Sequence, residues 1–215
     1  MSGTPAPVLV EQFRTNRVFW EQFEIAEKIG KLHDTSVLEQ LNPYLKDNDR
    51  HVRGNAAYVF AALGDDDGFE VIKAILSDRS ERSEGQGIPG GNWDLRAQVS
   101  ADRYYAVHLF GELKDVRAVA ILVPLLNDPE VHYIVPWALS EIGEKAAVPP
   151  IMLMLTDKNP DMRVLAIDAL ERLRAKESLP QLRLLLHDDQ RIHFDGLGTV
   201  AEAARAAIAK LEAMP

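Results

Sequence analysis

The residues Gly85 to Gly90 read Gly-Gln-Gly-Ile-Pro-Gly and match the pattern G-x-G-x-x-G, which binds phosphate in some proteins. In dinucleotide-binding folds this motif joins a strand to a helix, and its glycines let the backbone approach a pyrophosphate. Here a predicted helix precedes the motif, and Pro89 lies inside it. We therefore do not predict a phosphate site at these residues.

Other patterns that support catalysis or metal binding are weak in this chain. It has no cysteine, which excludes disulfides, thiolate zinc sites and cysteine nucleophiles, and it contains neither a G-x-S-x-G elbow nor a Walker loop. His33 and His187 each precede an aspartate at a predicted turn, where capping explains them. His193 lies near Asp188 and Asp195, but the spacing does not bring the three together. The sequence predicts no catalytic residue, no metal and no cofactor.

Aromatic side chains are better candidates for function, because Tyr and Trp bury a large area and keep a polar tip for hydrogen bonding. Whether these side chains share a surface depends on the elements that carry them. The candidate partner-binding residues are Tyr58, Tyr104, Tyr105, His108, Tyr133, Trp137 and Trp93.

The elements come from an internal repeat, marked by polar turns that contain Asp. These turn residues are Asp47, Asp78, Asp128, Asp157 and Asp188, separated by 31, 50, 29 and 31 residues. The intervals predict a repeat of roughly 30 residues with one insertion of about 20 residues in the second interval.

Apolar residues keep a constant register on both sides of each turn. Nine, six and two residues before each turn Asp the chain is apolar, which is the spacing of one helix face. A second helical pattern follows each turn, and an apolar residue recurs in it at Ile29, Phe60, Phe110, Leu139, Leu170 and Ile208. The sequence therefore predicts an all-α fold, an α-solenoid of about six stacked helical hairpins.

The segments DNDRHVRGNAAYVFAALGD and DKNPDMRVLAIDALERL resemble the HEAT-repeat superfamily, and the short period is similar to the branch called PBS-lyase HEAT-like repeats. The resemblance covers roughly residues 17–213. Iron-binding deoxyhypusine hydroxylases of this superfamily use His-Glu dipeptides, and no histidine here precedes a glutamate.

The family's Asp and Arg six residues apart are present as Asp47/Arg53 and Asp157/Arg163. The resemblance implies that the Asp caps the second helix and that the Arg bridges the turns of neighbouring repeats. The turn of Asp128 differs from this pattern, because His132 stands where Arg is expected. We therefore expect the series of bridging arginines to be interrupted there.

One HEAT-like solenoid is expected to span residues 1–215, with three special segments. These are an N-terminal arm or cap at 1–16, an inserted loop at 79–100, and a short insertion near the C-terminal cap at 188–199. Long loops in compact proteins are often functional, so we expect either a solvated loop or a binding loop anchored by Trp93.

The resemblance also implies that second helices line a concave face, which would place the aromatic candidates in one groove. Tyr105 has an alternative role in packing against the neighbouring repeat. Acidic residues near the groove, among them Glu112 and Glu141, favour a basic or amphipathic protein or peptide as the partner. The primary hypothesis is a non-enzymatic interaction scaffold. The alternative is a bilin lyase or tetrapyrrole-binding chaperone of the PBS-lyase type.

Composition excludes further classes of partner. The 215 residues carry a net charge of -9, which disfavours nucleic acid and with it a HEAT-like DNA glycosylase. The longest apolar run is about nine residues, short of a membrane span, so no membrane is expected. Without a recognisable signal peptide, we expect a cytoplasmic protein whose oligomeric state is open.

Overall fold

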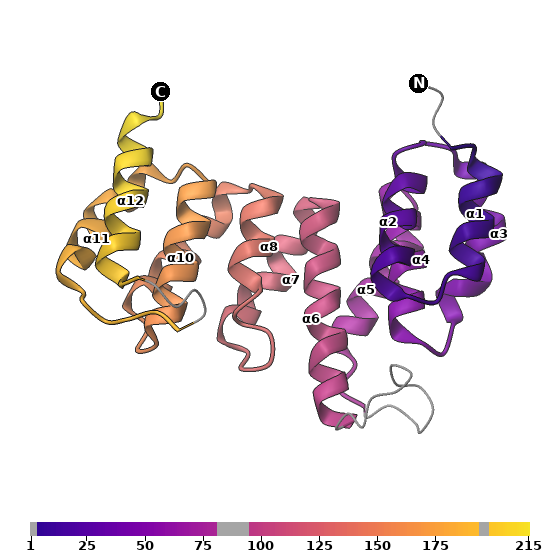
Figure 1. Cartoon of the computed structure of the whole chain (residues 1–215), viewed down its shortest axis with the longest axis horizontal. Helices are drawn as coiled ribbons and strands as arrows, with labels where there is room; N and C mark the ends of the chain where they lie inside the picture. The colour runs from indigo at the N-terminus through magenta and orange to yellow at the C-terminus, as the bar shows by residue number, and fades with distance from the viewer. Residues whose placement is uncertain (1–3, 81–94, 194–197) are drawn as a thin grey trace. The chain divides into compact units, whose positions relative to one another are not determined.

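The computed structural model describes residues 4–80, 95–193 and 198–215 (Figure 1). Within these ranges the regular secondary structure is helical, apart from an isolated bridge between Arg191 and Thr199. The predicted all-α fold is confirmed. The helices gather into two compact units, Met1–Leu109 and Phe110–Pro215, and the last turn of helix α6 belongs to the second unit.

Among its described residues, the N-terminal unit contains five α-helices and most of a sixth. They are α1 (Ala6–Thr15), α2 (Phe19–Gly30), α3 (Leu38–Leu41), α4 (Arg50–Ala62), α5 (Asp66–Ser77) and α6 (Leu95–Leu113). Helix α1 occupies most of the segment expected to be an arm or a cap, and it buries Leu9, Val10 and Phe13. The segment 79–100, expected as an inserted loop, lies mostly outside the described residues, and α6 begins within it at Leu95.

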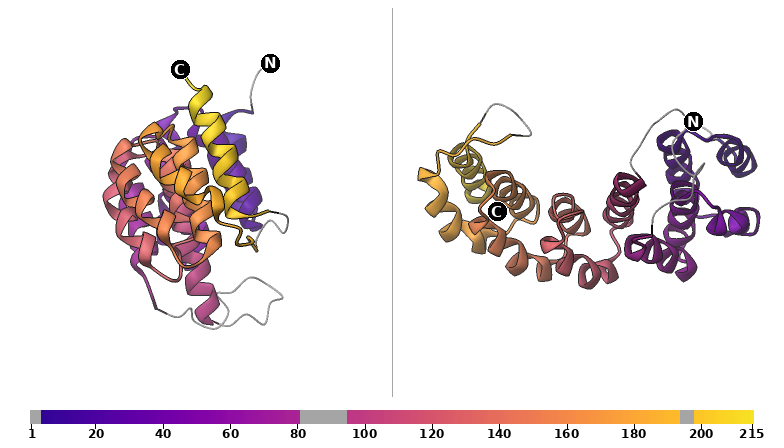
Figure 2. Two further views of the ribbon diagram at one scale, coloured as in Figure 1. Left: turned by 90° about the vertical axis from the view of Figure 1, so that its left-hand side faces the viewer. Right: turned by 90° about the horizontal axis from the view of Figure 1, so that it is seen from below.

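The C-terminal unit repeats a short first helix followed by a second helix. Its helices are α7 (Val119–Leu122), α8 (Val135–Ile142), α9 (Val148–Leu153), α10 (Pro160–Arg172), α11 (Leu179–Leu184) and α12 (Val200–Ala213). Helix α10 packs on both α8 and α12, so the second helices of this unit form one layer. Seen nearly along their axes, they lie beside the layer of shorter first helices (Figure 2, right).

Prolines explain why α3 and α7 are short. Pro43 and Pro124 each occupy the start of a 3₁₀ segment, Asn42–Lys46 and Val123–Asn127, which follows directly on α3 or α7. A proline inside a helix removes an amide donor and clashes with a carbonyl one turn earlier. Pro149 and Pro180 instead lie at the first turns of α9 and α11, where a missing amide costs nothing.

The turns follow the expected Asp and Arg pattern with one correction. Asp47 and Asp157 do not cap the second helices; each accepts a hydrogen bond from the amide two residues later, in the turn itself. The capping residues are Asp49 and Asn159, because these are the residues with extended backbone just before the helix.

The arginine bridge between neighbouring turns is confirmed in the C-terminal unit. Arg163 donates through Nη1 to the Asp157 carbonyl at 2.6 Å, and its Nη2 lies 2.7 Å from Asp188 of the next turn. Where the sequence has His132, the ring Nδ1 lies 2.9 Å from the Asp128 carbonyl. The histidine therefore keeps the contact with its own turn that arginine makes elsewhere.

Candidate binding site

An exposed tryptophan packs against other aromatic rings in the N-terminal unit. Trp20, near the start of α2, keeps 48% of its surface exposed, and the preceding Val18 keeps 56%. The Trp20 ring centroid lies 4.3 Å from Phe19, 5.7 Å from Tyr105 and 5.8 Å from His108. We call Val18, Trp20 and His108 the Trp20 surface.

Helix α6 supports this surface through Tyr105, which is 2% exposed. The Tyr105 hydroxyl donates to the Asn55 side chain, and the Asn55 amide donates to Gln22 at 2.9 Å. Gln22 in turn donates to the Phe13 carbonyl at 2.9 Å. A buried polar chain with every bond made favours one arrangement of its helices, so it fixes α6 against α2 and α4.

Gly54 on α4 lets Tyr105 lie close. A side chain at position 54 would meet the Tyr105 ring at 3.3 Å and the Leu109 side chain at 3.0 Å. The small residue at this position of α4 therefore allows α6 to approach it.

The imidazole of His108 is the titratable group of the Trp20 surface. Burial lowers the pKa of His108 below its usual 6.5, and the charge of Glu27 opposes this shift. The lowered pKa favours the neutral ring, which can donate one hydrogen bond and accept another. It also packs against Phe23, whose centroid lies 5.6 Å away.

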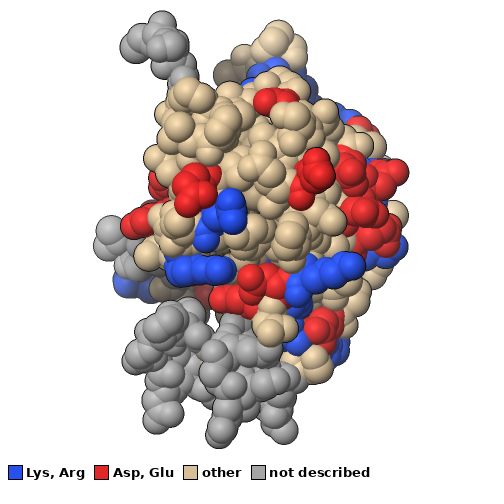
Figure 3. Space-filling model, turned by 90° about the vertical axis from the view of Figure 1, so that its right-hand side faces the viewer, with Lys and Arg blue, Asp and Glu red and all other residues tan. Residues whose placement is uncertain are grey.

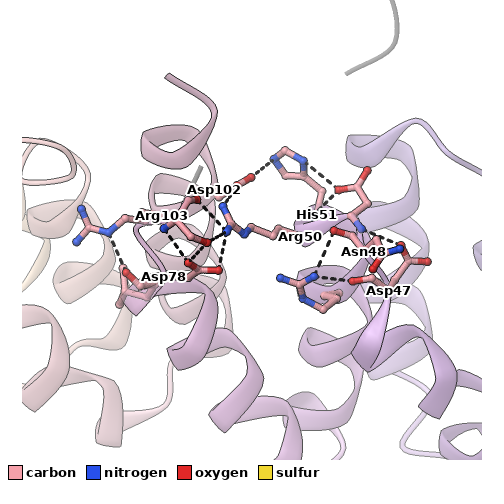
Figure 4. A network of polar contacts seen from close by, with 11 residues as sticks. Asp47, Asn48, Arg50, His51, Asp78, Asp102 and Arg103 are labelled. Atoms are coloured by element: carbon pink, nitrogen blue, oxygen red, sulfur yellow. Dashed lines mark hydrogen bonds and ion pairs between the residues drawn. The ribbon is translucent and has the colours of Figure 1, made fainter. Parts of the chain in front are cut away.

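An ionic network surrounds Arg50, whose side chain is buried (Figure 4). Arg50 at the start of α4 reaches Asp78 at 2.6 Å and Asp102 at 3.0 Å, and the Asp102 side chain is fully buried. Arg50 also donates to the Ser80 carbonyl at 3.0 Å. One guanidinium therefore links the start of α4, the end of α5 and the middle of α6.

His51 connects the network to the aromatic rings. Its Nε2 lies 3.7 Å from Asp102, and its ring centroid lies 4.6 Å from Phe19 and 5.3 Å from Tyr105. Phe19 and Tyr105, which contact Trp20, are thus positioned by ring packing and by their contact with His51 of the ionic network.

The aromatic residues proposed from sequence fall in two units. In the N-terminal unit, Tyr58 and Tyr105 are buried, while Tyr104 and His108 are partly exposed. Tyr58 contacts Phe23, with ring centroids 5.1 Å apart. Tyr58 and Tyr105 therefore pack beneath the Trp20 surface and are not part of its exposed area.

The C-terminal unit holds Tyr133 and Trp137. Tyr133 is 47% exposed, and its ring stands edge-on to His132 with centroids 6.0 Å apart. Trp137 is partly exposed and packs over Gly111, where a side chain would come within 2.7 Å of its ring. Trp93 and the glycines of the G-x-G-x-x-G match lie outside the described residues.

Trp20 itself was missed by sequence reasoning, as were Phe19 and Phe23. Apart from Trp93, the predicted aromatic set came from α4, α6 and α8 and from the turn before α8, and the start of α2 was not part of it. The run Phe19-Trp20-x-x-Phe23 was the available signal, because one turn of helix holds three aromatic residues.

Within the described ranges, no group of three or more His, Asp or Glu side chains is arranged to hold a metal ion. His193 contacts Asp161 at 3.2 Å, an exposed pair. No helix within those ranges is long and apolar enough to cross a membrane.

Charge is mixed on the face of the molecule drawn in Figure 3. Acidic and basic side chains there surround a broader uncharged area, with neither sign forming a continuous field. Among the residues described on this face, basic side chains do not form a continuous surface of the kind that coats nucleic acid.

Comparison with known proteins agrees with the helical repeats. Residues 127–193 match the family of HEAT repeats. The chain is 31% identical over 109 residues to the bilin biosynthesis protein PecE of Mastigocladus laminosus, covering 49% of this chain and 38% of that protein. It is 28% identical over 152 residues to PecE of a Nostoc species, covering 69% and 55% of the two chains. The chain thus spans about half or less of these relatives' length.

A solved structure shares the fold. It is the complex of CpcE and CpcF of phycocyanin lyase from a Nostoc species, with a TM-score of 0.55 and 20% identity. The match covers 83% of this chain and 66% of that chain. Together with the paired helices in both units, these matches identify HEAT repeats at residues 127–193 and a similarity of a wider part of the chain to the PecE proteins.

Proposed function

We propose that this chain is a non-enzymatic binding subunit that holds a protein partner at the Trp20 surface. The observation that carries the proposal is that Trp20 is half exposed and yet packed against three other aromatic rings. An exposed ring that is already ordered loses little conformational entropy when a partner covers it. Tryptophan in such a setting is the residue type most enriched at binding hot spots.

A precedent for partner binding supports the proposal. The solved protein with the same fold is one member of a complex of two proteins. Tyr104, Tyr133 and Trp137 remain proposed contact residues, and Tyr133 offers a second exposed ring in the C-terminal unit.

Affinity capture from the native host lysate tests the proposal, with wild type, Trp20→Ala and Tyr133→Ala as baits. Leu184→Ala is the matched control, because Leu184 is a large apolar side chain that is 80% exposed on α11. We expect Trp20→Ala to weaken capture by about tenfold or more, the size of a hot-spot loss. Leu184→Ala should retain the partner, and circular dichroism should show all four proteins folded.

Equal capture by Trp20→Ala and Leu184→Ala would refute the Trp20 surface as the contact. Loss with Tyr133→Ala alone would move the partner surface to the C-terminal unit and would likewise contradict the proposal.

A second candidate function is favoured by the names of the relatives, which are bilin biosynthesis proteins. A flat tetrapyrrole could stack on the exposed indole of Trp20, and the chain would then act as a bilin-binding chaperone or a lyase component. Added biliverdin distinguishes this function by colour. A shift of its absorbance by wild type that is lost in Trp20→Ala would support the bilin function, and an unchanged spectrum would exclude it.

A further inference from the structure

The exposed face of α2 places carboxylates beside Trp20. Glu24 and Glu27 lie four and seven residues after Trp20, which puts all three on one face of the helix. Helical side chains lean toward the N-terminus, so the Glu24 carboxylate is directed toward the turn that carries Trp20. Glu24 is exposed. Among the described residues it makes no hydrogen bond or ion pair.

Glu27 is partly engaged by a neighbouring cation. Its Oε1 lies 3.3 Å from Lys31 Nζ one turn later, and the Lys31 side chain is 71% exposed. Exposed ion pairs of this kind contribute little to stability, so a second cation can displace Lys31 at small cost.

The chemistry of this face suits a positive charge. The face of an indole ring attracts cations through its quadrupole, and tryptophan does so more strongly than other aromatic residues. A carboxylate one turn away adds a counter-charge. His108 beside Trp20 adds little repulsion near pH 7, since burial lowers the pKa of its imidazole.

We propose that Trp20, Glu24 and Glu27 form a receptor for a cationic side chain, an arginine or a lysine, on a segment of a protein partner. This inference rests on the proposed function and states the chemistry of that partner. It also separates the two candidate occupants of the surface, because the carboxylates of a bilin would meet like charge at Glu24 and Glu27.

Nuclear magnetic resonance of the full ¹⁵N-labelled chain tests the receptor directly. The indole N–H signal of Trp20 is identified by its loss in Trp20→Phe. The probe is N-acetyl-arginine amide, and its control is N-acetyl-citrulline amide, which has nearly the same shape without the charge. We expect a saturable shift with the arginine probe and binding about two- to fivefold weaker with citrulline, the range of exposed cation–π contacts.

Glutamine variants test the two carboxylates. Glu24→Gln and Glu27→Gln should each weaken binding of the arginine probe by about two- to fivefold, the range of exposed ion pairs. Glu70→Gln on α5 is the control, because Glu70 is an exposed carboxylate, like Glu24, and pairs with Lys73 three residues away, as Glu27 pairs with Lys31. Glu70→Gln should bind the arginine probe as tightly as wild type does.

Equal shifts with arginine and citrulline would overturn the cation receptor, as would unchanged binding in both Glu24→Gln and Glu27→Gln. Either result would leave partner capture at Trp20 intact, since that is measured with the natural partner. Conversely, capture unaffected by Trp20→Ala would refute the proposed function whatever the arginine probe does.

Discussion

Asp102 is the buried carboxylate of the ionic network in the N-terminal unit. Its side chain is fully buried, and it lies 3.0 Å from Arg50 and 3.7 Å from His51. A buried charge that loses its partner keeps its desolvation penalty without the compensating attraction. The fold of this unit therefore depends on this carboxylate far more than on the ion pairs at its surface.

Replacing Asp102 by Asn removes the charge and nearly preserves the shape. We expect the free energy of unfolding to fall by about 3 kcal/mol, the lower end for a broken buried pair, because Arg50 keeps Asp78. Urea denaturation followed by circular dichroism measures the loss.

Asp168→Asn is the control for this substitution, since its pair with Arg172 is about half exposed and should contribute less than about 1 kcal/mol. Similar small losses in the two variants would show that the Arg50 network is not a stabilising element.

At the scale of elements, close approach of helices decides where the aromatic rings lie. Gly68 on α5 faces α4, and a side chain there would lie 2.3 Å from the Ala57 carbonyl oxygen and 2.3 Å from the Ala61 nitrogen. Both obstacles are backbone atoms, which cannot rotate away. The α4–α5 contact therefore requires glycine at position 68. The same contact sets the position of Asp78 at the end of α5.

Gly68→Ala should destabilise the chain by about 1–3 kcal/mol or more through overpacking. This loss would exceed the gain of about 1 kcal/mol in helix propensity that alanine offers over glycine. Thermal unfolding monitored at 222 nm measures the effect.

Gly54→Ala provides the comparison, because the atoms nearest to its new side chain belong to the side chains of Tyr105 and Leu109 and not to the backbone. We expect a smaller loss there. A Gly68→Ala protein that melts above wild type would contradict the packing argument.

For the whole molecule, charge adds a long-range component to binding. The chain carries 33 acidic and 24 basic residues, a net charge of -9. Such a surplus attracts cationic partners from a distance and raises their association rate. Salt screens this attraction, because the Debye length falls from about 30 Å at 0.01 M to about 3 Å at 1 M.

Capture of the partner should therefore fall as sodium chloride rises from low to high concentration. The measurement is the association rate of the captured partner by surface plasmon resonance, in wild type and in Glu24→Gln. The association rate of Glu24→Gln should fall less on salt addition than that of wild type, since the variant has one fewer carboxylate whose attraction salt can screen. Association that is unchanged or faster at high salt would point to a purely apolar contact.

The repeat, the helices and the turns could be predicted from sequence because their causes are local. Helical spacing, prolines such as Pro43 and Pro180, and turn aspartates such as Asp157 act within a few residues of themselves. For the same reason the sequence could predict that Arg163 contacts the turn that carries Asp157. The capping position was misassigned by two residues, because a turn carboxylate and a capping carboxylate look alike in sequence.

The binding surface was decided by tertiary structure. Whether an aromatic residue is buried depends on what distant segments pack against it. Tyr105 is buried by partners such as Asn55, which is 50 residues away in the chain, and Arg50 meets Asp102 across 52 residues. By itself the sequence determined which residues are aromatic and which helices carry them. Only the packing of α2, α4 and α6 determined that Trp20 remains exposed while Tyr58 and Tyr105 do not, because exposure is a property of neighbours and not of register.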